Sequence, residues 1–226
     1  MHKRAILFDI DGTLVDSNDA HVEAWQRAFA AGGHSFTRSE IHDQVGKGGD
    51  NLVPSLLPDA DAGTIARLGH AEGGIYRREY MPKVVPFDGA KQILRHLAHR
   101  GHTLVLASSA SRAEVDFYVE LLDAEGLLSG TTSKDDVAAS KPCADIFLAA
   151  LELTGCTAEA AVVIGDTPYD VLAARRAGID AIALLSGGFE PPQLASCEPI
   201  AIYDNVEQLD SEYARSPLCI DPWVEA

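Results

Sequence analysis

From residue 88 onward, short apolar runs alternate with stretches that have the periodicity of amphipathic helices. The apolar runs predict buried strands at residues 103–107, 161–164 and 181–185, with weaker candidates at 131–133 and 200–203. The stretches between them predict helices at residues 90–100, 113–122, 142–153 and 168–177. Strands and helices that alternate at this spacing form a parallel sheet with helices on both faces, so we expect an α/β fold.

Residues 17–80 have a different character, because they show helical periodicity and no strand-like run. The first helix is expected to begin at an N-cap provided by Asn18 or Asp19. Further helices are predicted at residues 39–45, 51–57 and 62–80. We therefore predict an all-helical cap domain over residues 17–83, inserted into a core domain made of residues 1–16 and 84–226. The sequence after Asp210 indicates neither a structure nor a role.

Two aspartates follow the first apolar run, residues 5–8, which reads as a buried strand. If the backbone stays extended there, its period of two directs Asp9 and Asp11 to the same side. Gly12 then permits a sharp turn. Two carboxylates this close repel each other unless a cation lies between them or one holds a proton. Taken alone, the pair also fits a strand-end turn with solvated acids.

Polar side chains stand at the carboxyl ends of three predicted strands, namely Asp9, Ser108 and Asp166. In open parallel sheets this edge is where ligands bind. Lys141 precedes a predicted helix headed by Pro142, and a helix N-terminus attracts anions. Singly, Ser108 reads as a helix cap, Lys141 as a solvated cation and Asp170 as a surface acid. A set of acids and a lysine at successive strand ends is much less expected by chance than any one of these residues alone, so the set indicates an active site.

The charge of the chain limits its partners. Lys and Arg total 18 and Asp and Glu total 34, which gives a formal net charge of −16. Such a surface repels nucleic acid and anionic membranes, so we expect neither as a partner. The four cysteines are scattered without metal-binding spacing, which is typical of reduced thiols, and no apolar run is long enough to span a membrane. A cytoplasmic location is the expectation.

Four motifs, taken in chain order, resemble those of the haloacid dehalogenase-like hydrolase superfamily, in the branch with a helical cap after the first motif. The first is Asp9-x-Asp11-Gly12-Thr13, and the second is Ser108. The third is Lys141 followed by Pro142, where Ala144 replaces the second proline of the usual Lys-Pro-x-Pro-Asp. The fourth is Gly165-Asp166-Thr167-x-x-Asp170. The resemblance covers roughly residues 4 to 209 and implies a Rossmann-like core.

The resemblance also implies a mechanism. Asp9 is expected to attack phosphorus and form an aspartyl-phosphate, and Asp11 to act as general acid and then general base. Ser108 and Lys141 are expected to balance the charge on the phosphoryl group. Mg²⁺ is the expected cofactor, held by the all-oxygen set of Asp9, the Asp11 main-chain carbonyl and Asp166. Asp170 is expected either to support the metal or to hold Lys141 in place. The expected substrate contacts are Gly12, Thr13, Ser109, His21 and Lys47.

The predicted cap offers two weaker resemblances. Residues 46–50 resemble the cap loop of phosphoglycolate phosphatase-type enzymes, although a flexible turn between helices is nearly as good a reading. His21-x-x-x-Trp25 resembles the first cap helix of β-phosphoglucomutase-like members, and Trp25 is also explained by packing alone. We therefore expect a Mg²⁺-dependent phosphatase acting on a small phosphorylated metabolite that resembles phosphoglycolate or a sugar phosphate. A sugar-phosphate mutase is the alternative enzyme, and a regulatory or binding protein without turnover is the alternative of another class. The oligomeric state stays open.

Overall fold

A computed structural model describes residues 4–219, and its centre is a parallel sheet of six strands in the order β5-β4-β1-β6-β7-β8. Their bounds are β1 (Ala5–Phe8), β4 (Thr103–Ala107), β5 (Gly130–Thr132), β6 (Ala161–Gly165), β7 (Asp180–Leu184) and β8 (Ala201–Tyr203). The central strand β1 pairs with β4 and β6, so that Phe8 lies beside Leu106 and Ile164. The predicted α/β fold with a parallel sheet is confirmed.

Alternate residues of the strands pack on opposite faces of the sheet. Ile6 and Phe8 face the side covered by α5 (Ala90–His99), α6 (Arg112–Leu121) and α10 (Val206–Ser211). Ala5 and Leu7 face the side covered by α7 (Asp145–Thr154), α8 (Pro168–Arg176) and α9 (Pro191–Ala195). Both faces of the sheet are therefore buried, which is why its strands read as continuous apolar runs rather than alternating ones.

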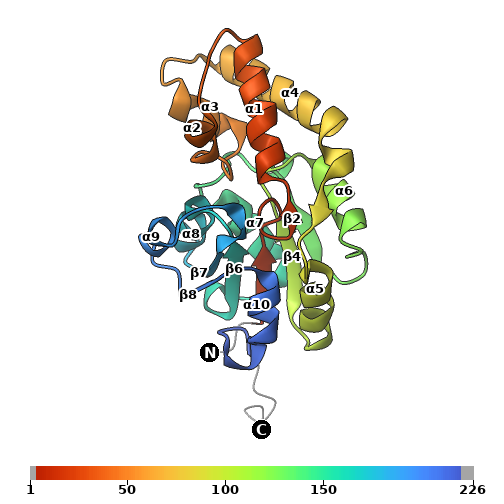
Figure 1. The fold of residues 1–226 in the computed structure, drawn as a ribbon. Helices are drawn as coiled ribbons and strands as arrows, with labels where there is room; N and C mark the ends of the chain where they lie inside the picture. The colour runs from red at the N-terminus through yellow and green to blue at the C-terminus, as the bar shows by residue number, and fades with distance from the viewer. Residues whose placement is uncertain (1–3, 220–226) are drawn as a thin grey trace.

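The helical insertion lies beyond one end of the sheet, as Figure 1 shows. It contains α1 (Asn18–Ala31), α2 (Arg38–His42), α3 (Gly49–Leu56) and α4 (Ala62–Glu79). These helices share a small apolar core that includes Trp25, Phe29 and Leu52. The two chain passages that connect them to the sheet pair as a short antiparallel ladder, β2 (Val15–Asp16) with β3 (Val85–Pro86). The boundaries of a separate cap domain at residues 17 and 83 remain a prediction.

Several elements start one to three residues away from the predicted position, and three of these helix starts have a clear local description. Helix α7 begins at Asp145 and not at Pro142, because Cys143 N–H donates to Ser140 and the first helical carbonyl is that of Ala144. Helix α1 is capped by Ser17 and not by Asn18 or Asp19, and the Ser17 hydroxyl makes no cap bond because it donates to Asp11. Helix α3 begins at Gly49, two residues before the predicted start.

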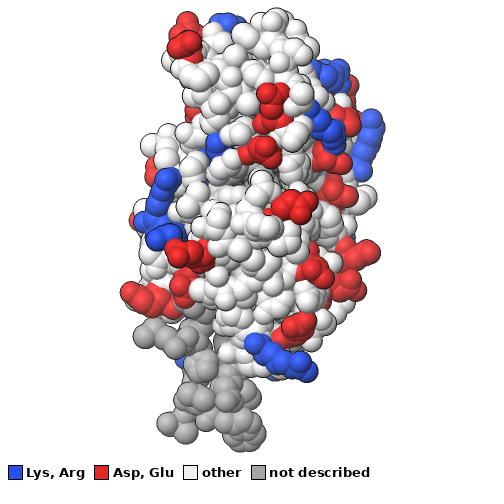
Figure 2. Space-filling model, turned by 60° about the vertical axis from the view of Figure 1, so that its left-hand side comes forward, with Lys and Arg blue, Asp and Glu red and all other residues white. Residues whose placement is uncertain are grey.

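The remaining short elements are 3₁₀ turns: η1 (Met81–Lys83), η2 (Lys134–Asp136), η3 (Ala158–Ala160), η4 (Leu185–Gly187) and η5 (Tyr213–Arg215). Among the described residues, no helix combines the length and the apolar character that a membrane crossing needs. Acidic and basic side chains are interspersed over the face in Figure 2, without a continuous basic patch on that face. A cytoplasmic location and the lack of nucleic-acid partners stay predictions.

Candidate active site

Three carboxylates meet at the carboxyl edge of the sheet. Asp9 follows β1, Asp166 follows β6, and Asp170 lies one turn into α8. One carboxylate oxygen from each lies within 4.8 Å of the others, and all three side chains are buried. The Asp9 N–H donates to the Ile164 carbonyl at 2.8 Å, which keeps Asp9 in the line of the sheet. The edge predicted from the sequence therefore does bring these acids together.

Lys141 is the cation inside this cluster. Its side chain is 1% exposed, its ammonium donates to Asp9, and it lies 2.7 Å from the Asp170 carboxylate. Burial acts to lower the pKa of Lys141, but the charges of Asp170 and Asp9 outweigh it and raise that pKa. Lys141 therefore stays charged while fully removed from water.

The three acids exceed the single lysine in charge. Burial raises the pKa of Asp9 well above its usual value, partly offset by Lys141 and reinforced by the charges of Asp170 and Asp166. Burial and the charge of Asp170 raise the pKa of Asp166 to about 7, against hydrogen bonds from Thr13 and Asn18 that lower it. A divalent cation among these oxygens would relieve the repulsion, and hard cations such as Mg²⁺ prefer this donor set. The residues therefore fit a Mg²⁺ ion.

Asp166 is oriented by two donors from the first motif region. Thr13 Oγ1 donates to one carboxylate oxygen at 2.8 Å, and Asn18 Nδ2 donates to the other at 2.9 Å. Gly12 has φ +77°, and a Cβ there would collide with the Asp166 carboxylate and the Asn18 amide. Glycine at this position therefore allows the close approach of the first and fourth motifs.

Asp11 lies in a different environment from Asp9. Its Oδ1 accepts hydrogen bonds from Ser17 Oγ at 2.6 Å and Tyr118 OH at 2.7 Å, and its Oδ2 accepts one from Ser108 Oγ at 3.3 Å. His21 Nε2 lies 3.2 Å from the same Oδ1. Although burial opposes it, the charge of His21 and these donors lower the pKa of Asp11 to about 2.

His21 connects Asp11 to a cap glutamate. Its Nδ1 lies 3.0 Å from Glu72 Oε1 of α4, and its ring stacks on Tyr76 at 3.8 Å between centroids. Burial acts to lower the pKa of His21, but Asp11 and Glu72 raise it to about 10. At neutral pH the Asp11 carboxylate is therefore ionised and the His21 imidazole is protonated, so that His21 Nε2 donates to Asp11.

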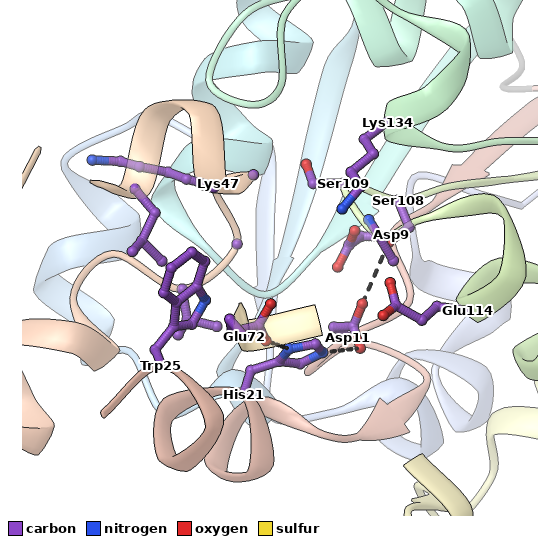
Figure 3. A pocket seen from close by; sticks show the side chains of 16 residues that line it. Asp9, Asp11, His21, Trp25, Lys47, Glu72, Ser108, Ser109, Glu114 and Lys134 are labelled. Atoms are coloured by element: carbon purple, nitrogen blue, oxygen red, sulfur yellow. Dashed lines mark hydrogen bonds and ion pairs between the residues drawn. The ribbon is translucent and has the colours of Figure 1, made fainter. Parts of the chain in front are cut away.

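A cavity extends from Asp9 and Ser108 to Trp25 in the cap (Figure 3). His21 and Glu72 lie along one side of it, and Lys134 of η2 points toward Asp9 from the opposite side. The hydroxyl of Ser109, which also lines this cavity, is buried without a hydrogen-bond partner. An acceptor or donor of a bound molecule can satisfy that hydroxyl.

Lys47 lines the cavity with its backbone, but its ammonium is directed elsewhere (Figure 3). It donates to Gln44 Oε1 at 2.6 Å and to Ser55 Oγ at 2.9 Å, and it lies 4.5 Å from the centre of the Tyr169 ring. The predicted contact of Lys47 with substrate therefore requires the ammonium to leave these partners.

The glycine-rich loop that contains Gly46, Gly48 and Gly49 is docked on the core. Asp50 Oδ2 accepts the Ser140 N–H at 3.0 Å, and Asn51 Nδ2 donates to the carbonyls of Ser140 and Lys141 at 2.9 and 3.3 Å. Gly46 packs on Thr167 and Gly48 on Ser140 so closely that neither position has room for a Cβ. The start of the cap's third helix thus holds the backbone around Lys141.

Comparison with known proteins assigns the family. Residues 6–184 match the family described as haloacid dehalogenase-like hydrolase. The chain belongs to the haloacid dehalogenase-like hydrolase family.

Two curated relatives and one solved structure illustrate this hydrolase family. Validoxylamine A 7′-phosphate phosphatase of Streptomyces hygroscopicus subsp. limoneus is 29% identical over 184 residues, which are 81% of this chain and 86% of that protein. Phosphoglycolate phosphatase of Agrobacterium fabrum is 27% identical over 213 residues, 90% of this chain and 89% of that one. The crystal structure of a hydrolase from Pseudomonas syringae superposes with a TM-score of 0.88 at 28% identity, covering 93% of this chain and 98% of that one.

The structure of this family member adds residues of the site that the motifs did not indicate. Glu72 and Lys134 line the cavity, Tyr118 donates to Asp11, and Asn18 donates to Asp166. Each comes from a segment whose distance in space from Asp9 depends on how the helices pack. Of these four residues, only Asn18 could have been predicted from the sequence, because it lies two residues after Asp16 and therefore close to the first motif.

Gly12→Ala should lower stability more than Gly101→Ala. Both glycines have positive φ, +77° and +86°, which costs a residue with a Cβ about 1–2 kcal/mol. A Cβ at Gly101 meets no atom within 4 Å, whereas one at Gly12 collides with Asp166. We expect the collision to cost a further 1–3 kcal/mol or so, measured by urea unfolding. Equal losses in the two variants would contradict the close approach of Gly12 and Asp166.

Proposed function

We propose that this hydrolase is a Mg²⁺-dependent phosphatase that cleaves a small phosphorylated metabolite through an aspartyl-phosphate. One observation carries the proposal: two aspartates two residues apart occupy opposite environments. Asp9 lies among carboxylates that fit a cation, and Asp11 lies among hydrogen-bond donors. Neighbouring acids with divergent environments take different chemical roles. The two curated relatives, both named phosphatases, support the same reaction class.

Asp9 is the nucleophile in this proposal. Its carboxylate attacks phosphorus, the bond from phosphorus to the leaving oxygen breaks, and an acyl phosphate forms on Asp9. Asp9, Asp166 and Asp170 would hold Mg²⁺, which would supply positive charge to the phosphoryl group. Lys141 adds a fixed charge beside Asp9, and Ser108 and Ser109 offer hydroxyls at the end of β4. These groups balance the charge that develops in phosphoryl transfer.

Asp11 moves the proton. The protonated His21, whose Nε2 lies 3.2 Å from Asp11 Oδ1, passes its proton to Asp11, which donates it to the leaving oxygen as the bond of that oxygen to phosphorus breaks. Asp11 then takes a proton from the water that attacks the acyl phosphate, so Asp9 is released with inorganic phosphate. Tyr118 and Ser17 hold the Asp11 carboxylate in place through both steps.

The arrangement of cap cations favours water over a sugar hydroxyl as the second acceptor. A mutase needs cationic side chains that grip a second phosphate. Lys47 donates to Gln44 and Ser55, Arg77 pairs with Glu114 at 3.1 Å, and Arg78 pairs with Glu79 at 2.8 Å. We therefore place the mutase second. A binding protein without turnover is disfavoured, because the nucleophile, acid and lysine are all present.

Asp9→Asn should abolish phosphate release and leave the fold intact. An amide is a poor nucleophile, so we expect a loss of about 1000-fold or more in kcat on p-nitrophenyl phosphate, about 4 kcal/mol of barrier. Circular dichroism checks the fold, and Asp16→Asn is the matched control, because Asp16 is exposed. A loss within tenfold would reject Asp9 as the nucleophile.

Removing the charge of Asp166 should weaken the binding of Mg²⁺. Asp166→Asn keeps the shape of the side chain but removes one charge from the three-acid cluster. We expect the Mg²⁺ concentration for half-maximal activity to rise at least tenfold, measured by titration after treatment with EDTA. An unchanged Mg²⁺ requirement, or full activity in EDTA, would contradict the metal assignment.

Phosphate release should need no bisphosphate primer. With β-glucose 1-phosphate, we expect the same yield of inorganic phosphate with and without glucose 1,6-bisphosphate, and little glucose 6-phosphate. Both products are followed in one reaction by coupled assays. Glucose 6-phosphate that forms only with the primer, with little free phosphate, would establish the mutase instead.

A further inference from the structure

A second, outer cleft adjoins the cavity at Asp9. The outer cleft, between α4 and residues 134–140, is larger than the inner cavity. The two share the lining residues Trp25, Gly49, Glu72 and Lys134. These four residues lie between the inner cavity and the outer cleft, and we call them the neck.

The inner cavity is rich in acceptors beyond the reacting acids. Glu72 and Glu114 both line it, and both are buried. Glu72 contacts His21, while Glu114 accepts from Ser111 and from Arg77. A carboxylate offers about four acceptor sites, so each glutamate has capacity left for a hydroxyl or an ammonium group. Because Glu72 already pairs with His21 and Glu114 with Arg77, neither of these cations is free to bind a carboxylate of the substrate.

Lys134 places a positive charge at the Asp9 end of the inner cavity. Its side chain runs toward Asp9, where the phosphoryl group of a substrate lies (Figure 3). Within residues 4–219, no side-chain partner of its ammonium is found. Lys134 therefore suits the phosphate end of a substrate, and the glutamates face the leaving group.

The outer cleft is open because one face of α4 carries small side chains. Ala62, Ala66 and Gly69 follow each other at helical spacing and line the cleft. A Cβ on Gly69 meets no atom within 4 Å. Val137 and Ala138 form the opposite wall, and His70 and Asp135 add polar groups at its rim. The cleft has room for a further ring beyond the neck.

We propose that the substrate is a phosphomonoester with an extended leaving group of about two rings, rich in hydroxyl or amine groups and free of carboxylate. This inference rests on the proposed phosphatase function and names its substrate class. The first ring lies in the inner cavity beside Trp25 and Glu72, and the second passes the neck into the outer cleft. Phosphoglycolate, with a carboxylate one carbon from the phosphate oxygen, is a poor fit.

The first test compares four substrates at saturating Mg²⁺: trehalose 6-phosphate, sucrose 6-phosphate, phosphoglycolate and p-nitrophenyl phosphate. We expect kcat/KM for at least one disaccharide phosphate to exceed that for phosphoglycolate tenfold or more. If p-nitrophenyl phosphate is hydrolysed but kcat/KM for phosphoglycolate equals or exceeds that for both disaccharide phosphates, the proposed substrate class is wrong. The proposed phosphatase function is unaffected by that result. No release from any of the four overturns both.

The second test fills the outer cleft. Gly69→Leu should lower kcat/KM for the better disaccharide phosphate at least tenfold and leave that for p-nitrophenyl phosphate within twofold. Gly74→Leu is the matched control, because Gly74 also lies on α4 with an open Cβ position but does not line the cleft. Gly74→Leu should leave kcat/KM unchanged for both substrates. Ala66→Leu replaces Gly69→Leu if that variant does not fold. Equal losses on both substrates, or no loss on either, would overturn the use of the outer cleft.

Discussion

The burial of Lys141 against Asp9 and Asp170 is the constraint on which the rest of the site depends. Lys141 is 1% exposed and Asp9 is 4% exposed, so neither charge is solvated by bulk water. Removing one partner of such a buried pair costs about 3–5 kcal/mol, because the other charge is left uncompensated. The pair can exist only where strands β1 and β6 are adjacent and the loop before α7 folds back over their ends. The strand order and the position of this loop are therefore conditions for a charged nucleophile.

The same edge separates two aspartates that the sequence places two residues apart. Asp9 remains in the acid cluster, while Asp11 turns toward Ser17, Tyr118 and His21. The first environment raises the pKa of Asp9, and the second lowers the pKa of Asp11 to about 2. Both environments include residues of the helical insertion, because His21 contacts Asp11 and Asn18 donates to Asp166. The cap helices thus contribute both to the proton-transfer residue and to the acid cluster around the nucleophile.

The fold and the acid cluster could be predicted from the sequence because their signals are local. Each strand is an apolar run, and each of Asp9, Ser108 and Asp166 follows directly after such a run. The contacts of the cap could not be predicted in this way. The bonds of Tyr118 and Glu72 depend on the packing of α4 against α6, where Tyr76 OH meets Tyr118 OH at 2.5 Å. The direction of Lys47 depends on Gln44, Ser55 and the Tyr169 ring, which no spacing rule brings together. The early start predicted for α7 was wrong because Pro142 suits a first helical turn in general, whereas here it lies in the turn from Ser140 to Cys143 that contains Lys141.

The contacts between cap and core connect substrate choice to catalysis. Asn51 donates to the carbonyls of Ser140 and Lys141, and Asp50 accepts the Ser140 N–H, so the start of α3 and the Lys141 loop are fixed to each other. Gly49 of this same helix start lines the neck between the inner cavity and the outer cleft. A leaving group that displaces the neck must therefore also displace the backbone that positions the lysine. Molecules that fill the neck without moving it keep Lys141 beside Asp9, and this restricts efficient transfer to leaving groups of matching shape.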